Sequence, residues 1–215
     1  MTKRRRSQGE ADEVVVRRGV LNQERWEEIR RAAAAEFYEK GFKGARLQDI
    51  ASRVGLLTGS LYYYIESKED LLFALVDTAF RNGLEATAEE PSIAGTGAPL
   101  RLQTFIERML GVLEGTEFAS VVVVQRDRKF LTDPHRAQVD AMQFQLRDHV
   151  SGIIKDGIAH GEFDADVDVD VATSSLFAML NSTGEWAGNA DPVAYDQIAA
   201  WYCRLFLRAL WSRSP

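Results

Sequence analysis

Apolar residues recur at helical spacing along most of the chain. The first clear repeat comprises Trp26, Ile29, Ala33, Phe37 and Tyr38. Asn22 precedes this repeat as a capping residue, and Gly41 follows it as a stop. Further helical patterns cover about residues 47–54, 58–64, 67–80, 100–115, 118–131, 135–160, 168–187 and 192–212. The pattern predicts an all-α protein.

Two segments interrupt or complicate this pattern. Residues 87–99 are rich in Gly, Pro and Thr and are expected to form a loop. The β-branched run Val121–Val124 is short and lies between helical patterns, so we interpret it as buried helix. We therefore divide the chain into a flexible basic arm (1–21), a first helical domain (22–80) and a larger helical domain (81–215).

Composition and charge indicate which part of the chain is acidic and whether the chain could span a membrane. The net charge is −6, but residues 1–70 carry 14 basic and 12 acidic side chains, so the acidic excess lies in the rest of the chain. The arm contains Lys3–Arg6, and it is expected either to contact DNA or to be a disordered tail. No apolar run approaches the ~20 residues that span a bilayer. The one cysteine, Cys203, fits a reducing cytoplasm.

Two short helices, about residues 47–54 and 58–64, meet at Gly55 in the pattern of a helix-turn-helix. Such a turn needs a residue that tolerates positive φ, which glycine does without steric cost. Ile50 and Ala51 are expected to be buried in the first helix, and Leu61 and Ile65 in the second. The remaining side chains of the second helix should therefore be exposed.

The second helix is expected to enter the major groove of DNA with its first residues leading. Small residues there allow close approach, and Tyr62 and Tyr63 can reach the backbone or base edges. We interpret Tyr64 as a packing residue. The predicted DNA contacts are Arg46, Gln48, Thr58, Gly59, Ser60, Tyr62, Tyr63 and Lys68. Burial of Thr58, Ser60 and Tyr63 would contradict this interpretation.

Several segments carry a specific motif: Gly41-Phe42, Asp49-Ile50-Ala51, Gly55, Gly59-Ser60-Leu61-Tyr62 and Ser67-Lys68-Glu69-Asp70-Leu71-Leu72. On these segments, residues 23–75 resemble the TetR family of transcriptional regulators. The chain departs from the family's usual pattern at Ala45-Arg46, at Leu57, where a small polar residue is common, and at Ile65. The resemblance implies that residues 22–80 are a DNA-binding domain (the head) for double-stranded operator DNA. It also implies that residues 81–215 are a helical ligand-binding domain that dimerises through its last two helices.

The last two helical patterns fit dimerisation. One has a face of small residues, namely Val171, Ser174, Ser175, Ala178 and Ser182. The other is more apolar than a lone surface helix should be, with Ile198, Trp201, Tyr202, Leu205, Phe206 and Leu210. A symmetric homodimer would bury both faces, whereas packing inside one monomer is the alternative.

Residues 118–186 also resemble a subgroup of TetR-type repressors of lipid and sterol degradation that respond to acyl-CoA thioesters. The matching segments are residues 121–127, 157–163 and 166–170, with Trp186. The resemblance implies a small-molecule effector, such as an acyl-CoA, in a mostly apolar pocket. The predicted ligand contacts are Phe105, Met109, Leu113, Val123, Arg126, Phe144, Phe177 and Trp186, with Arg128 as a second candidate for an anion.

No pattern favours catalysis, a cofactor or a metal. The three histidines are not at metal-ligand spacing, and no phosphate-binding glycine loop or nucleophile elbow occurs. The run Asp164–Asp170 lacks the glycine and glutamate of a calcium loop, so we interpret it as a solvated turn and helix cap. The sequence thus predicts a cytoplasmic, dimeric, ligand-relieved repressor. The alternative is a helical ligand-binding or interaction protein that does not bind DNA.

Overall fold

A computed structural model describes residues 4–87, 95–111, 118–187 and 195–211. The described residues are helical, and their one extended pairing is a bridge between Phe163 and Trp211. The chain divides into two compact units, Met1–Leu71 and Leu72–Pro215. None of the described helices is both long enough and apolar enough to cross a bilayer.

The first unit comprises α1 (Arg4–Gly44), α2 (Leu47–Arg53), α3 (Thr58–Leu61) and the start of α4 (Lys68–Thr87). Its core side chains are fully buried, and they include Ile29, Ala33, Phe37, Ile50, Leu61 and Leu71. These residues recur at helical spacing, because burial of one face of each helix stabilises the unit. The predicted helices over 47–54 and 67–80 are confirmed, whereas the helix predicted over 58–64 ends at Leu61 and continues as a turn over residues 62–64.

The start of α1 differs from the prediction. We expected a flexible arm over residues 1–21 and a cap at Asn22, but α1 begins at Arg4 and includes Asn22. The segment contains no proline and many good helix formers, so its backbone continues the helix although its apolar residues follow no helical period. Gly41 interrupts α1 with φ of +70°, which confirms the predicted stop.

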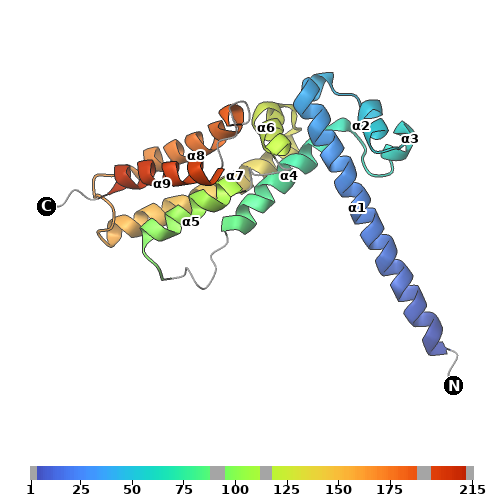
Figure 1. Ribbon diagram of the computed structural model, residues 1–215, viewed down its shortest axis with the longest axis horizontal. Helices are drawn as coiled ribbons and strands as arrows, with labels where there is room; N and C mark the ends of the chain where they lie inside the picture. The colour runs from blue at the N-terminus through green and yellow to red at the C-terminus, as the bar shows by residue number, and fades with distance from the viewer. Residues whose placement is uncertain (1–3, 88–94, 112–117, 188–194, 212–215) are drawn as a thin grey trace. The chain divides into compact units, whose positions relative to one another are not determined.

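The second unit contains the rest of α4, then α5 (Ala98–Gly111), α6 (Phe118–Asp127), the 3₁₀ turn η1 (Arg128–Phe130), α7 (Asp133–Ala159), α8 (Val169–Trp186) and α9 (Tyr195–Leu210). Helices α5, α7, α8 and α9 share one buried core (Figure 1). The run Val121–Val124 lies in α6 as predicted, with Val123 and Val124 buried. Of the predicted loop over 87–99, residues 88–94 lie outside the described residues.

The acidic segment before α8 forms a turn and a cap, as predicted. The Asp164 carboxylate accepts a hydrogen bond from the backbone of Asp166 at 3.0 Å. The Asp168 carboxylate accepts bonds from the backbone N–H groups of Asp170 and Val171, both at 3.0 Å. A carboxylate in this position satisfies N–H groups that a helix start leaves unpaired. The segment therefore fixes where α8 begins.

Residues 157–163 form a tight corner between α7 and the segment that leads to α8. The backbone N–H groups of Glu162 and Phe163 donate to the Gly157 carbonyl at 2.8 and 3.1 Å. The Glu162 carboxylate then accepts the Ala98 N–H at 2.7 Å, at the start of α5. The Phe163 ring is buried directly against Gly157. This segment, which carries part of the subgroup resemblance, therefore has a structural role.

Replacing Gly157 with alanine should destabilise the protein. The new Cβ would overlap Cδ2 of the Phe163 ring and would lie 2.9 Å from Cβ of Ala98. Forcing an extra methyl into a packed site costs about 1–3 kcal/mol of unfolding free energy. Urea denaturation followed by circular dichroism measures the change.

The matched control for this substitution is Gly152→Ala in the same helix. A Cβ at Gly152 meets nothing within 4 Å. Alanine there should raise stability by up to about 1 kcal/mol, because glycine is the poorer helix former. Equal stabilities for the two variants would contradict the packing described at Gly157.

Candidate nucleic-acid interface and ligand cavity

The helix-turn-helix is formed by α2 and α3. Gly55 joins them with φ of +67°, a conformation that favours glycine. The Leu56 N–H donates to the Ala51 carbonyl at 2.9 Å and closes the turn. Ile50, Ala51 and Leu61 are fully buried, as predicted. The burial of Leu61 determines which side chains of α3 face outward.

The outward side chains form what we call the recognition edge, defined by residues 57–60, 62 and 63. Gly59 and Ser60 are exposed, and Thr58 is half-buried. Tyr62 is 55% exposed and Tyr63 is 79% exposed, whereas Ile65 is buried. The Tyr64 ring meets the Tyr63 ring edge to face, with centroids 5.2 Å apart. Thr58, Ser60 and Tyr63 are not buried inside the unit, so the interpretation survives its most direct structural test.

The start of α2 carries the other predicted DNA contacts. Arg46 occupies the N-cap position of this helix and has an extended backbone. The side chains of Arg46 and Gln48 are exposed. In helix-turn-helix proteins, the helix that precedes the recognition helix crosses the sugar–phosphate backbone of DNA. Both side chains are therefore candidates for contact with that backbone. Their contact with DNA stays a prediction.

Lys68 has partners within the unit that the sequence did not indicate. Its ammonium donates to the carbonyls of Phe42 and Ala45 at 2.7 and 3.0 Å, which leaves its third N–H for the predicted phosphate contact, and that contact stays a prediction. It also lies 4.6 Å from the centre of the Phe42 ring, within the range of a cation–π contact. Lys68 therefore holds the corner between α1 and α2. A motif shows that a lysine is present but does not show which carbonyls lie within its reach.

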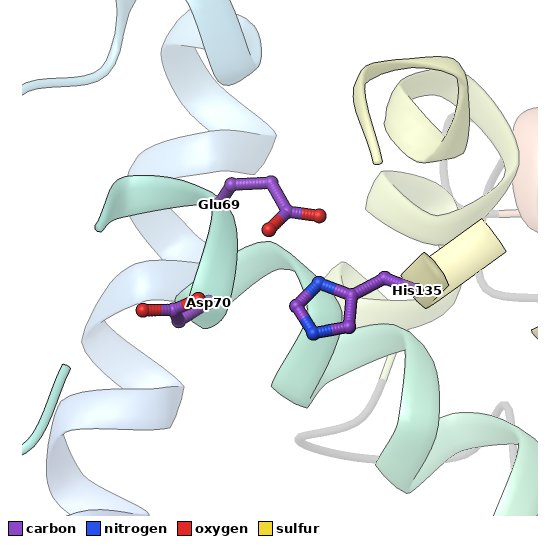
Figure 2. Close-up of side chains that lie close together, drawn as sticks. All are labelled: Glu69, Asp70 and His135. Carbon is purple, nitrogen blue, oxygen red and sulfur yellow. The ribbon is translucent and has the colours of Figure 1, made fainter. Parts of the chain in front are cut away.

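The start of α4 is capped by Ser67 and Asp70. The Asp70 N–H bonds to the Ser67 hydroxyl at 3.2 Å, and the Asp70 carboxylate accepts the Ser67 N–H at 2.8 Å. Figure 2 shows Asp70 and Glu69 on this first turn. The reciprocal bonds form a capping box, which fixes the chain immediately after the recognition edge.

Figure 2 also labels His135, a residue of α7 in the second unit. Its ring stacks on the Phe73 ring of α4, with centroids 3.8 Å apart and planes 5° from parallel. Stacking at this distance gives His135 a packing role at the start of α7.

An ion-pair network that the sequence analysis did not identify joins α1 to α2. The Glu36 carboxylate is fully buried and pairs with Lys40 at 2.6 Å and with Arg53 at 3.0 Å. Lys40 also pairs with Asp49 at 3.0 Å, and its hydrogen bond lowers the pKa of Asp49. The hydrogen bonds that the Lys40 ammonium donates to the Glu36 and Asp49 carboxylates raise the pKa of Lys40. The i,i+4 spacing of Glu36 and Lys40 was the one available signal.

A cavity of about 80 Å³ lies within the second unit. Its walls are mostly apolar and come from α4, α5, α6, η1, α7 and α8. The lining residues are Ala79, Phe80, Met109, Val124, Gln125, Arg128, Gln143, Leu146, Phe177, Leu180 and Asn181. A mostly apolar pocket with a few oriented polar groups is typical of a small-molecule site.

The polar groups of the cavity are already oriented by hydrogen bonds. Gln125 donates to Asn181 at 2.9 Å. Arg128 donates to Gln143 at 3.0 Å and to Asp140 at 2.8 Å. Three amides and one guanidinium thus surround an apolar chamber.

The predicted ligand contacts fall into three groups. Met109, Phe177 and Arg128 line the cavity. Phe105 and Val123 are buried in the core and are not among its lining residues, and Leu113 lies outside the described residues. The side chains of Phe144 and Trp186, predicted as walls, and of Arg126, predicted as an anion contact, are exposed and are not among the lining residues, which corrects their assignment to this cavity. Arg126 instead pairs with Asp127 at 2.8 Å.

The predicted dimerisation residues fall into an exposed set and a buried set. On α8 the small-residue face is exposed along its length, at Val171, Ser174, Ser175, Ala178 and Ser182. On α9, Trp201 is 66% exposed and Leu205 is 58% exposed. Ile198, Phe206 and Leu210 are buried in the monomer. Figure 1 shows α8 and α9 side by side, and the Thr183 and Tyr202 hydroxyls hydrogen-bond between them at 2.9 Å.

This fold and its exposed recognition edge define a helix-turn-helix DNA-binding protein with a second, cavity-containing helical unit. Residues 29–75 match the bacterial regulatory proteins of the tetR family, and residues 97–210 match the tetracyclin repressor-like C-terminal domain. The chain belongs to the TetR family. It is a DNA-binding transcriptional regulator and not an enzyme, and regulators of this family bind operator DNA as dimers.

Two curated relatives align with most of the chain. The HTH-type transcriptional repressor KstR2 of Mycolicibacterium smegmatis is 27% identical over 186 residues, 85% of this chain and 89% of that protein. The fatty acid metabolism regulator protein of Bacillus subtilis is 25% identical over 169 residues, 78% of this chain and 85% of that protein.

Solved structures share the fold. PfmR of Thermus thermophilus, a TetR family regulator, has a TM-score of 0.77 and 27% identity, covering 84% of this chain and 97% of that one. AibR in complex with isovaleryl coenzyme A and operator DNA has a TM-score of 0.72 and 21% identity, with the same coverage.

Proposed function

We propose that the protein is a cytoplasmic repressor that leaves its operator when an acyl-CoA thioester binds in the second unit. The observation that carries this proposal is the cavity, which combines apolar walls with one guanidinium. The family assignment already excludes the alternative of a ligand-binding protein without DNA binding.

The size and lining of the cavity favour a short acyl group. Its volume of about 80 Å³ is roughly half that of an engineered cavity that holds benzene. Phe80, Met109, Leu146 and Phe177 supply apolar contacts for a hydrocarbon chain. The amides of Gln125 and Asn181 can bond a thioester carbonyl.

Arg128 is the group we assign to the anionic part of the ligand. Guanidinium groups bind phosphate and carboxylate in bidentate geometry. Arg128 lines the cavity, whereas Arg126 is paired with Asp127 and lies outside it. A ligand anion would replace Asp140 and Gln143 as partners of Arg128. Ligand binding would therefore break the hydrogen bonds by which Arg128 of η1 holds α7.

The names of similar proteins support the same class of effector. AibR binds isovaleryl coenzyme A and operator DNA, and the Bacillus subtilis relative regulates fatty acid metabolism. In our proposal the ligand favours a conformer whose two heads no longer match major grooves one helical turn, ~34 Å, apart. Because coupling is reciprocal, operator DNA must weaken ligand binding by the same factor.

Release of a labelled operator by a panel of acyl-CoA thioesters tests the proposal. Short-chain acyl-CoA should lower operator affinity, and CoA without an acyl group should not. Arg128→Ala should weaken the response about tenfold or more, because a hydrogen bond to a charged group contributes about 1.5–3 kcal/mol. Fluorescence anisotropy measures release, and a thermal-shift assay measures ligand binding.

The matched control is Arg126→Ala, which removes a guanidinium two residues away. This variant should respond to acyl-CoA as the wild type does. Stabilisation by planar cationic drugs with no stabilisation by any acyl-CoA would contradict the proposed effector class.

A further inference from the structure

Leu57 is an apolar side chain on the recognition edge that the fold itself does not need. It precedes α3 and is 81% exposed. Its backbone is extended, with φ of −74° and ψ of 146°, and its carbonyl accepts the Ser60 N–H at 2.9 Å. The backbone of Leu57 thus supports α3, while its side chain extends into solvent.

The surroundings of Leu57 leave room for close approach by another molecule. A Cβ added to Gly59 would meet nothing within 4 Å, so the surface beside Leu57 is low and open. Ser60 and Tyr63, on the same short segment, are exposed. Leu57 is therefore continuous with the surface that a TetR-type regulator places in the major groove.

The chemistry of leucine restricts what it can recognise on DNA. It has no polar group, so it cannot bond a phosphate or the polar edge of a base. The apolar group that the major groove offers is the C5-methyl of thymine. We infer that Leu57 contributes to operator selectivity by packing against a thymine methyl in each half-site.

The effect of such a contact on binding affinity is large enough to measure. Burial of one methyl-sized group changes an equilibrium constant about fourfold. A symmetric operator contains the contact twice, so loss of both methyls should weaken dimer binding by about 15-fold. Neither the charge of the protein nor the base-pairing of the DNA changes in this comparison.

Uracil substitution in the operator tests this inference, because it removes the methyl and keeps the base pair. Wild-type protein and Leu57→Ala are titrated against an operator selected from random duplexes, then against versions with each symmetric pair of thymines replaced by uracil. One substitution should weaken wild-type binding by about 15-fold. The same substitution should change binding of Leu57→Ala less than twofold.

Two controls separate this inference from the rest of the account. Leu100→Ala removes an exposed leucine in the second unit and should keep the full uracil effect. Thermal unfolding of Leu57→Ala should match the wild type. Wild-type binding that no uracil lowers, or a uracil effect that persists in Leu57→Ala, overturns the role of Leu57. The assay uses no effector, so its outcome is independent of the proposed acyl-CoA response.

Discussion

Replacing Tyr63 with alanine is expected to lower operator affinity about 100-fold. Tyr63 is 79% exposed on the recognition edge, and the buried residues around it, Leu61 and Ile65, hold α3 without it. A direct contact to a base edge or phosphate lost in each of two heads, at about 1.4 kcal/mol per head, gives this factor. Anisotropy titration of a labelled operator measures the affinity, and sedimentation measures the dimer.

The fold and the dimer should be unaffected by this substitution, because the Tyr63 ring contributes little to the core. Phe144→Ala is the matched control, since Phe144 is also a largely exposed aromatic residue, at 68%, but belongs to the second unit. It should retain wild-type affinity. An unchanged affinity for Tyr63→Ala would mean that the recognition edge is wrongly assigned.

Replacing Trp201 with arginine is expected to convert the dimer to monomers. Helix α9 presents the exposed side chains of Trp201 and Leu205, and α8 presents exposed small side chains that allow close approach. A two-fold axis places two copies of Trp201 in the interface, one from each protomer, so a substitution there buries two charges. Desolvating two unpaired guanidinium groups should cost several kcal/mol.

Loss of the dimer should also reduce operator binding, because a two-fold site needs two heads. Analytical ultracentrifugation at micromolar concentration measures the mass, and anisotropy measures binding. Leu100→Arg adds the same charge at a half-exposed leucine of α5 and should leave the dimer intact. A dimeric Trp201→Arg variant would exclude this face of α9 from the interface.

Most helices follow from local patterns that the sequence shows directly. The stops at Gly41 and Gly55, the capping box at Ser67 and the cap at Asp168 each depend on one residue type in one backbone position. Such signals are local, so they remain valid in the folded chain. The start of α1 was missed because its first turns carry no apolar period, which was the signal used to locate helices.

The site was harder to predict where it depends on tertiary packing. Periodicity shows that Phe105 and Phe144 belong to helices but does not show which cavity, core or surface each faces. Phe105 packs in the core, and Phe144 is exposed. The pairing of Glu36 with Arg53 joins positions 17 residues apart and depends on how α1 meets α2. The carbonyl partners of Lys68 were not foreseen for the same reason, since they lie more than 20 residues earlier in the chain.

The recognition edge was predictable because two constraints agree. Leu61 and Ile65 had to be buried for α3 to pack, and Gly55 determined where α3 begins. The outward side chains followed from these positions. Leu57 was noted as a departure from the family pattern, but its exposure came only from the structure.

Salt-dependent binding to the DNA upstream of the protein's own gene is the most direct test of the central claim, that residues 46–64 present a DNA-reading edge. Anisotropy titrations with that DNA and with an unrelated duplex, at several salt concentrations, give both affinities. The account predicts that specific binding persists at salt that removes binding to the unrelated duplex, and that Tyr63→Ala loses this difference. Equal affinities and equal salt dependence for both duplexes would contradict it.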